Sequence, residues 1–552
     1  MQIIRNFIFV CSFMGLRIAE ERKRPHIVFM IVDDLGWNDV SFHGSIQIPT
    51  PNIDVIARDG IILNNYYTIH MCSPSRGALM TGKYPIRIGF QHRVIVADAP
   101  WGLPLQEKIL PQYLKSIGYS TRAVGKWHLG FFNEEYLPLN RGFDSFFGYY
   151  SGVEDYYTHF ATSLSNLTGL DLHDNFENAW SYEGVYGTEL YTEKAKDVIL
   201  NHNTSEPLFL YFSQQAPHSG NFNNALQVPD KYVEPLEGIE DEERRKFAGM
   251  VSAMDYSVGE IFEALEEASM LDDTLFIFTT DNGGAVEGAD STRGSNFPLR
   301  GSKYTLWEGG VRGVAFMWSQ QLRQHSRVYN DLMFLTDWLP TLLSAADSAD
   351  VAQDIDGYSV WSSLLSNSSS QRNEILLNID RLSHVEGIRW KNYKLVNGSY
   401  FDGFFDGWYD ENGTLFNESR SPAQSLEVYR KTYLELLEQS KAARILQDKY
   451  NKTPCSPISE DLTSCPRIPF AVCDESPPSP QDRCDPNLGA CLFDIEKDPC
   501  EFHNIAELHP EIVEKLATQI RKYDAVEVPP LYVPLDPAAD PKLHGMAWVP
   551  WR

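Results

Sequence analysis

The chain has 552 residues, of which 43% are hydrophobic and 22% charged, a composition typical of a large globular protein rather than a disordered one. Its 75 acidic and 47 basic residues give a formal net charge of −28, and the sequence pI is about 4.9. These values, with no basic stripe in the sequence, argue against a nucleic-acid-binding protein, because phosphate backbones are bound through clustered lysine and arginine.

The N-terminal segment has the pattern of a secretory signal peptide. Arg5 precedes an apolar stretch from Phe7 to Leu16, which is too short to span a bilayer and fits the hydrophobic region of a signal over approximately residues 1–19. The alternative is a buried N-terminal strand. No other apolar run approaches membrane-spanning length, so we predict no membrane span.

Strands and amphipathic helices alternate from Pro25 onward. Strands are predicted at 26–34, 119–128, 207–213 and 274–284, and helices at 110–118, 190–202 and 244–270. This alternation predicts an α/β fold in which helices cover a large, mostly parallel sheet. The predicted catalytic domain covers residues 24–375.

The character of the sequence changes beyond about residue 375. The aromatic and glycine-rich stretch "NGSYFDGFFDGWYDENGT" is followed by a predicted helix at 425–450 and then by a cysteine-rich segment at 455–500. We predict that residues 376–552 form a smaller C-terminal domain of the α+β class.

Sequons and tail cysteines support passage through the secretory pathway. Asn-x-Ser/Thr sequons, which are acceptors for N-glycosylation, occur at Asn166, Asn203, Asn367, Asn397, Asn412, Asn417 and Asn451. The tail cysteines are Cys455, Cys465, Cys473, Cys484, Cys491 and Cys500. An even number without zinc-type spacing indicates disulfides within the tail. Of the possible pairs we predict only Cys491 with Cys500.

Polar side chains directly follow four of the predicted strands. They are Asp33 and Asp34, Lys126 and His128, His218, and Asp281 and Asn282. In open α/β sheets the ligand crevice lies at the carboxyl ends of the strands, so these side chains are candidates for one site. Each acidic pair alone is commonly a turn or a helix cap. Together, their hard oxygen atoms suit calcium or magnesium rather than a soft metal.

Five basic residues on different segments complete the candidate site: Arg76, Lys126, His128, His218 and Lys303. A lone lysine or histidine is usually an ordinary surface or core residue. If these side chains converge beside a metal, they indicate an anionic substrate held by local charge in an otherwise acidic protein.

Cys72 is, apart from Cys11, the only cysteine before the tail. A lone cysteine is most often a small buried hydrophobic residue. Its surroundings, "CSPSRGALMTG", resemble the first signature of the sulfatase family, C-x-P-S-R followed by T-G, and "GYSTRAVGKWH" resembles the second. The motifs "VDD", "PH", "DNGG" and "GSKYTLWEGGVR" recur in the family's order over about residues 25–320. "GKYPIRIGFQH" and "CLFDIEKDPCE" are most similar to the arylsulfatase B (N-acetylgalactosamine 4-sulfatase) group.

The resemblance implies an alkaline-phosphatase-like fold and a modified nucleophile. In sulfatases the signature cysteine, here Cys72, is converted to formylglycine by a formylglycine-generating enzyme in the secretory pathway. One hydroxyl of the hydrated aldehyde attacks sulfur, and the second allows the resulting ester to collapse and release sulfate, which serine or an unmodified thiol could not do.

The resemblance also implies a role for each candidate residue. Asp33, Asp34, Asp281 and Asn282, with the modified Cys72, would hold one calcium ion. Arg76 would hold the hydrate, and Lys126 and Lys303 would bind sulfate. His218, with Lys303, would lie near the leaving oxygen and stabilise or protonate it, and His128 would take the proton from the second hydroxyl.

The implied substrate is a sulfated glycan, such as N-acetylgalactosamine 4-sulfate in a glycosaminoglycan, or an aryl sulfate. The implied location is the lysosome or the extracellular space. Two other hypotheses are a phosphatase or phosphodiesterase of the alkaline phosphatase superfamily, and a glycan-binding relative without catalytic activity. The first would require further Asp and His ligands for two zinc ions, and the second is disfavoured by the intact motif at Cys72, Pro74 and Arg76.

Overall fold

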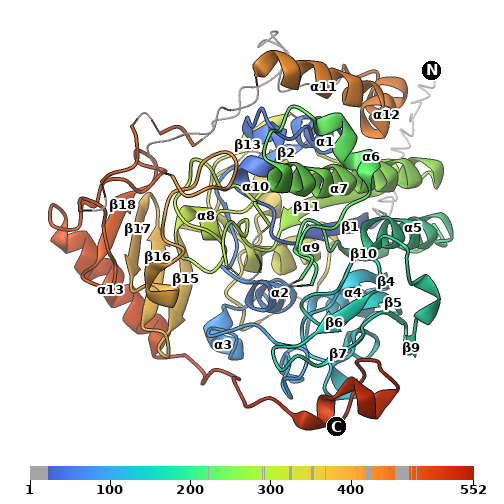
Figure 1. The fold of residues 1–552 in the computed structure, drawn as a ribbon, viewed down its shortest axis with the longest axis horizontal. Helices are drawn as coiled ribbons and strands as arrows, with labels where there is room; N and C mark the ends of the chain where they lie inside the picture. The colour runs from blue at the N-terminus through green and yellow to red at the C-terminus, as the bar shows by residue number, and fades with distance from the viewer. Residues whose placement is uncertain are drawn as a thin grey trace, which may run out of the picture.

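The computed structural model describes residues 23–552 except 222, 289, 291, 323–325, 350–352, 367, 417–424, 454–470, 474 and 480. The predicted signal segment and two of the tail cysteines, Cys455 and Cys465, lie outside the described residues. The described chain folds around a ten-stranded sheet and a four-stranded sheet near the C-terminus (Figure 1). Within the described part, every helix is too short or too polar to cross a membrane.

The centre of the large sheet is parallel, as the alternation of strands and helices predicts. Its order is β13-β2-β12-β11-β1-β10-β4-β5-β8-β9, in which β11, β1, β10, β4 and β5 run parallel. Antiparallel pairs occur toward both edges, at β11–β12, β12–β2, β5–β8 and β8–β9. In this order the strands are Arg327–Tyr329, Ile61–Leu63, Ala315–Trp318, Thr274–Thr280, His26–Val32, Leu208–Ser213, Ser120–Lys126, Ser145–Tyr149, His173–Asp174 and Glu177–Asn178.

Strand β1 is apolar along its length because both of its faces are buried. Ile27, Phe29 and Ile31 point into one hydrophobic core, while Val28 and Met30 point into the other. The first core includes side chains from α2 (Cys72–Thr81), α4 (Leu110–Ser116) and α9 (Trp338–Ala345). The second includes side chains from α1 (Pro51–Asp59), α5 (Gly187–Leu200) and α7 (Glu242–Glu267).

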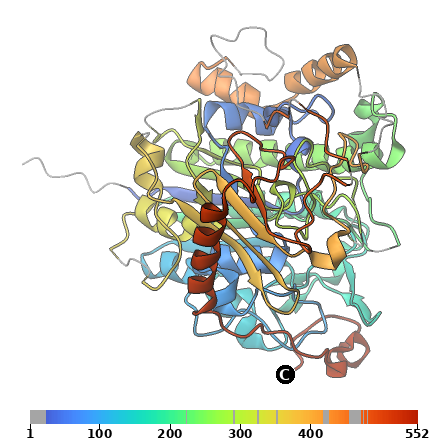
Figure 2. The ribbon, with the colours of Figure 1, turned by 90° about the vertical axis from the view of Figure 1, so that its left-hand side faces the viewer.

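The C-terminal sheet is antiparallel and is covered by one helix. Its strands are β15 (Glu374–Asp380), β16 (Val385–Trp390), β17 (Tyr393–Asn397) and β18 (Cys491–Asp494). Figure 2 shows α13 (Pro510–Asp524) lying across this sheet. Leu516 and Ile520 of α13 belong to the same core as Phe29 of β1, so the two sheets share one hydrophobic interior. The domain division at residue 375 therefore stays a prediction.

The predicted helix at 425–450 is two helices, α11 (Leu426–Glu438) and α12 (Lys441–Tyr450). The break lies at Ser440, whose hydroxyl accepts a hydrogen bond from the Ala443 amide at 3.1 Å and so caps the N-terminus of α12. Ile445 and Leu446 of α12 then pack into the core that contains α7. The chain beyond β17 thus returns to the large sheet before it completes the small one.

The predicted disulfide between Cys491 and Cys500 is wrong. Cys473 pairs with Cys500, and Cys484 pairs with Cys491, with Cα–Cα distances of 6.2 Å and 6.0 Å. Cys491 opens β18 and Cys500 follows that strand's far end. Cys500 and Cys473 pack in one hydrophobic cluster with Trp408, whereas Cys491 and Cys484 belong to the main core, so the two cysteines of the predicted pair lie in different clusters.

The remaining regular elements are short. Two pairs of strands stand apart from the main sheets: β14 (Met333–Phe334) with β3 (Tyr66–Tyr67), and β6 (Phe160–Thr162) with β7 (Thr168–Leu170). The short helices are α3 (Pro85–Ile88), α6 (Asp230–Val233), α8 (Glu308–Val311) and α10 (Trp361–Ser366).

Candidate active site

The carboxyl ends of β11, β1 and β4 lie at one edge of the large sheet. Asp33 follows β1 and Asp281 follows β11, and the last residues of these strands, Val32 and Thr280, are paired in register. Lys126 ends β4, two strands from β1. Gly125 before it has a φ of 96°, and a side chain there would collide with the Ser213 carbonyl at 1.9 Å, so the strand requires glycine at this point.

Helix α2 brings Cys72 to the same edge. Cys72 is the first residue of the helix, and its side chain is buried. The backbone amide of Ser75 donates a hydrogen bond to the Met71 carbonyl, which closes the first turn. Arg76 follows four residues later on the same helical face, which explains the spacing in the motif. The N-terminus of a helix carries partial positive charge, so the position of Cys72 suits an anionic ligand.

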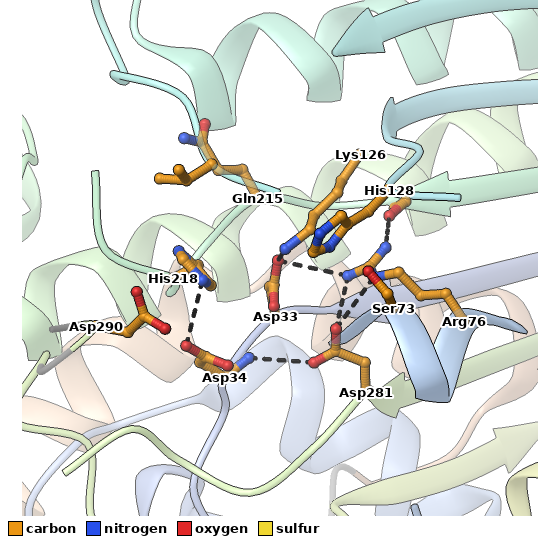
Figure 3. A network of polar contacts seen from close by, with 12 residues as sticks. Asp33, Asp34, Ser73, Arg76, Lys126, His128, Gln215, His218, Asp281 and Asp290 are labelled. Carbon is orange, nitrogen blue, oxygen red and sulfur yellow. Dashed lines mark hydrogen bonds and ion pairs between the residues drawn. The ribbon is translucent and has the colours of Figure 1, made fainter. Parts of the chain in front are cut away.

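Arg76 is fully buried and holds two of the acids (Figure 3). Its Nε and Nη2 donate to Asp281 Oδ2 at 3.1 Å and 2.9 Å, and Nη2 lies 3.4 Å from Asp33 Oδ2. Its Nη1 donates to the Ser213 hydroxyl at 2.5 Å. Burial alone would lower the pKa of the Arg76 guanidinium, but the charge of Asp281 outweighs it and raises that pKa well above its ordinary value.

Two lysines hold the acids that follow β1. Lys126 Nζ donates to Asp33 Oδ2 at 2.5 Å, and Lys303 Nζ donates to Asp34 Oδ2 at 2.9 Å. His218 Nε2 lies 3.5 Å from Asp34 Oδ2 and 3.3 Å from Lys303 Nζ. Lys126, Lys303 and His218, which were selected from the sequence, therefore lie in contact with the selected acids.

Two buried oxygen atoms of this group lack a hydrogen bond. Among the described residues, Asp33 Oδ1 and Asn282 Oδ1 have no partner, although Asn282 Nδ2 donates to Asp34 Oδ1 at 2.6 Å. Of the described His, Cys, Asp and Glu side chains, one group has ligand atoms within 4.8 Å of one another, and it comprises Asp33, Asp34, Cys72 and His218. Buried oxygens without partners, beside clustered carboxylates, are the donor set that a hard divalent cation requires. Asp281 lies at its margin, with Oδ1 3.4 Å from the Asp34 amide.

The charges of the site also fit a cation. Four carboxylates face three permanent cations: Asp33, Asp34, Asp281 and Asp290 against Arg76, Lys126 and Lys303. Burial, together with the charge of Asp33, raises the pKa of Asp281. With all four carboxylates ionised and the histidines neutral, the group carries one net negative charge, which would repel an anion. A divalent ion would change this to one net positive charge.

His128 lies at the opposite side of the group from Asp34, as Figure 3 shows. Its Nε2 donates to the Ile95 carbonyl at 2.8 Å, which leaves Nδ1 as the acceptor, and Nδ1 has no partner among the described residues. Burial first, and then Lys126 and Arg76, lower the pKa of His128 well below its ordinary value. His128 is therefore neutral and can accept a proton at Nδ1.

The comparison with known protein families agrees with this geometry. The family model described as "Sulfatase" matches residues 25–348, which is more than half of the chain. The chain belongs to the sulfatase family. It is accordingly a hydrolase of sulfuric esters, and the predicted fold class and enzyme class are confirmed.

Several relatives share most of this sulfatase's length. Arylsulfatase J of Mus musculus is 35% identical over 532 residues, which is 96% of this chain and 80% of that protein. N-acetylgalactosamine-6-sulfatase of Homo sapiens is 30% identical over 371 residues, or 64% of this chain and 68% of that protein.

Solved structures share the fold at lower identity. The crystal structure of Ps i-CgsB in complex with k-i-k-neocarrahexaose has a TM-score of 0.69 and 23% identity, covering 95% of this chain and 98% of the other. PsFucS1 sulfatase from Pseudoalteromonas sp. has a TM-score of 0.62 and 23% identity, covering 91% and 90%.

The sulfatase site opens into a pocket of about 200 Å³. Its wall includes Cys72, His128, His218 and Lys303 from the predicted set, and it also includes residues 94–97, 151–153 and 162–164, Asp290 and Tyr304. Sequence reasoning missed Asp290 and Tyr304, because neither lies in a strand-end pattern. It also missed Ser213, which the rule applied to Lys126 could have found, since Ser213 is the polar end of β10.

Proposed function

We propose that this sulfatase works through formylglycine made from Cys72, with one bound calcium ion, and that its substrate is a sulfated amino sugar. One observation carries the proposal: Cys72 lies in the wall of a pocket, close to the buried charges of Arg76, Lys126 and Lys303 and in one group with Asp33, whose Oδ1 lacks a partner among the described residues. Burial raises the pKa of the Cys72 thiol, so an unmodified thiol would remain protonated and be a poor nucleophile.

The residues present fit calcium. Asp33, Asp34, Asp281 and Asn282 would hold it with the modified Cys72, because all of these offer oxygen atoms. When bound, the ion would supply positive charge that polarises the sulfate oxygens and favours a deprotonated hydroxyl nearby. His218, which also lies within the group of ligand atoms, is instead assigned to the substrate because its Nε2 is adjacent to Lys303 Nζ at 3.3 Å.

The other roles follow from the contacts. Lys126 and Lys303 provide ammonium groups toward the sulfate, and Arg76 fixes the orientation of Asp281 and Asp33. His218 and Lys303 stand on one wall, where they would stabilise the departing sugar oxygen.

His128 has an unprotonated Nδ1 and would accept the proton whose removal lets sulfate leave. Such a base requires a neutral imidazole, which the burial of His128 and its cationic neighbours provide.

The proposed substrate is N-acetylgalactosamine carrying a single sulfate, with carbon 4 as the sulfated position, at the end of a glycosaminoglycan chain. The amino sugar is supported by the relative named N-acetylgalactosamine-6-sulfatase, whereas carbon 4 rests on the resemblance of "GKYPIRIGFQH" and "CLFDIEKDPCE" to the arylsulfatase B group. The sequons and tail disulfides support maturation in the secretory pathway, where a formylglycine-generating enzyme would act, followed by residence in the lysosome or outside the cell.

The test is mass spectrometry of the peptide containing "MCSPSR", combined with activity assays. Active protein should carry an aldehyde at Cys72, and activity should be greatest on a disaccharide with N-acetylgalactosamine 4-sulfate at its end. The panel includes the 6-sulfate isomer, a glucosamine sulfate and an aryl sulfate. Fully active enzyme with an alkylatable thiol at Cys72 would refute the nucleophile, and a preference for the 6-sulfate would refute the assigned position. Stoichiometric calcium should accompany the activity.

A further inference from the structure

Asp290 is a carboxylate in the pocket wall to which the proposed mechanism gives no role. Its Oδ2 accepts hydrogen bonds from Lys303 Nζ at 3.1 Å and from the Tyr304 hydroxyl. Its side chain is 23% exposed, whereas that of Asp34, which also contacts Lys303, is fully buried. Asp290 therefore faces the space that a substrate would occupy.

The contacts of Asp290 separate it from the proposed metal ligands. It is absent from the group of ligand atoms formed by Asp33, Asp34, Cys72 and His218. Figure 3 shows its carboxylate beside His218, on the side of the site away from Arg76. Since Lys303 and His218 are the groups assigned to the departing oxygen, Asp290 lies on the wall that the leaving alcohol would touch.

Asp290 can still accept a hydrogen bond from a ligand. Oδ2 is occupied by Lys303 and Tyr304, but Oδ1 receives no hydrogen bond from the described residues. A carboxylate oxygen of this kind binds hydroxyl and amide N–H groups strongly and repels anions at short range. The pair of Lys303 with Asp290 also leaves little positive charge on this wall to attract a second anion.

We propose that Asp290 determines specificity for the leaving alcohol: it accepts a hydrogen bond from a hydroxyl or amide next to the sulfated oxygen and excludes a second anionic group from that place. This inference rests on the proposed sulfatase mechanism and deepens it by assigning the substrate class. Monosulfated sugars with a neighbouring donor would be accepted, and sugars with an adjacent sulfate or carboxylate would be disfavoured.

The test compares two aryl sulfates that differ only in the group next to the ester. 2-Hydroxyphenyl sulfate offers a donor, and 2-carboxyphenyl sulfate offers an anion. For the wild type, kcat/KM should be higher for the hydroxyl compound, and in Asp290→Asn the ratio of the two values should fall at least tenfold. The same comparison applies to N-acetylgalactosamine 4-sulfate and the corresponding 4,6-disulfate.

Glu287→Gln is the matched control, because Glu287 precedes Asp290 by three residues, carries the same charge and does not line the pocket. In Glu287→Gln the ratio of the two kcat/KM values should equal that of the wild type. This control distinguishes the local contact of Asp290 from the general effect of removing one negative charge. An equal ratio in Asp290→Asn and Glu287→Gln would overturn the inference. The aryl esters carry no sugar, so a wrong sugar assignment would appear separately, as wild-type activity confined to the aryl compounds.

Discussion

Replacing Asp255 by asparagine should remove a measurable contribution to the dependence of this protein's stability on pH. Asp255 lies on α7 and accepts three hydrogen bonds at the start of α1. The Asn52 amide and side chain donate to Oδ2 at 3.2 Å and 2.9 Å, and the Ile53 amide donates to Oδ1 at 2.8 Å. Burial nevertheless raises the pKa of Asp255 to about 7, with a further contribution from Asp54.

The sign follows from proton binding. In the unfolded chain an aspartate has a pKa of about 3.9. Between that pH and about 7, Asp255 in the folded state therefore keeps a proton that the unfolded state has lost. Stability is therefore contributed at the acidic end of this window and is lost as pH rises through the folded pKa. From pH 5 to pH 7.5 the loss from this one carboxyl is about 2.5 kcal/mol.

The assay is denaturant unfolding at pH 5 and pH 7.5 for the wild type and Asp255→Asn. Asparagine does not titrate, so the difference between the two pH values should shrink by about 2.5 kcal/mol. Asp197→Asn, at an exposed position on α5, controls for the loss of a negative charge. An undiminished difference in Asp255→Asn would show that Asp255 is ionised throughout and that burial does not dominate its pKa.

Three further predictions concern the site and the surface. Asp33→Asn should lower bound calcium below one ion per chain, as measured by elemental analysis, because a charged ligand becomes neutral. The same substitution should lower kcat/KM at least about 100-fold. Full calcium occupancy in this variant would contradict the assignment of Asp33 as a ligand. Peptide mapping without reduction should recover Cys473 linked to Cys500 and Cys484 linked to Cys491; a peptide linking Cys491 to Cys500 would contradict the structure. Glycopeptide analysis should find Asn166, Asn203 and Asn397 modified and Asn412 unmodified, because only Asn412 of these is buried, with its Oδ1 accepting from Gln47 Nε2 at 2.6 Å.

The main sheet was predictable because its central strands are buried on both faces. A strand such as β1 or β11 then appears as an unbroken apolar run, and a polar residue directly after it must lie at the sheet edge. That reasoning places Asp33, Lys126 and Asp281 at one edge from the sequence alone. Cys72 and Lys303 follow no strand of the sheet, so strand patterns alone could not have placed them, and the sulfatase resemblance is what implies their roles.

Other features could not be predicted from the sequence because they depend on long-range packing. The residues of α11 and α12 form one continuous helical pattern, and only the docking of Ile445 and Leu446 against the large sheet makes Ser440 a cap. The cysteine pairs depend on where β18 lies, which the local spacing does not reveal. Asp290 reaches the pocket from an irregular segment, where no periodic pattern marks it.

The acidity of the chain gives a final prediction about where the enzyme works best. At neutral pH the formal charge of −28 should repel a polyanionic glycan at long range, although the pocket itself can attract one sulfate once a divalent ion is bound. Near pH 5 the chain is close to its pI of about 4.9, and the repulsion largely disappears.

His128 does not oppose activity at pH 5, because burial and its cationic neighbours lower its pKa and keep it neutral as a base. We therefore expect kcat/KM on a sulfated oligosaccharide to be higher at pH 5 than at pH 7.5. Added salt should raise it at pH 7.5, where it screens repulsion, and should have little such effect at pH 5. A small aryl sulfate, which has no polyanionic chain, is the control. Its kcat/KM should respond more weakly to salt. If salt lowers the oligosaccharide rate at pH 7.5, a positive surface guides the substrate and the argument from net charge fails.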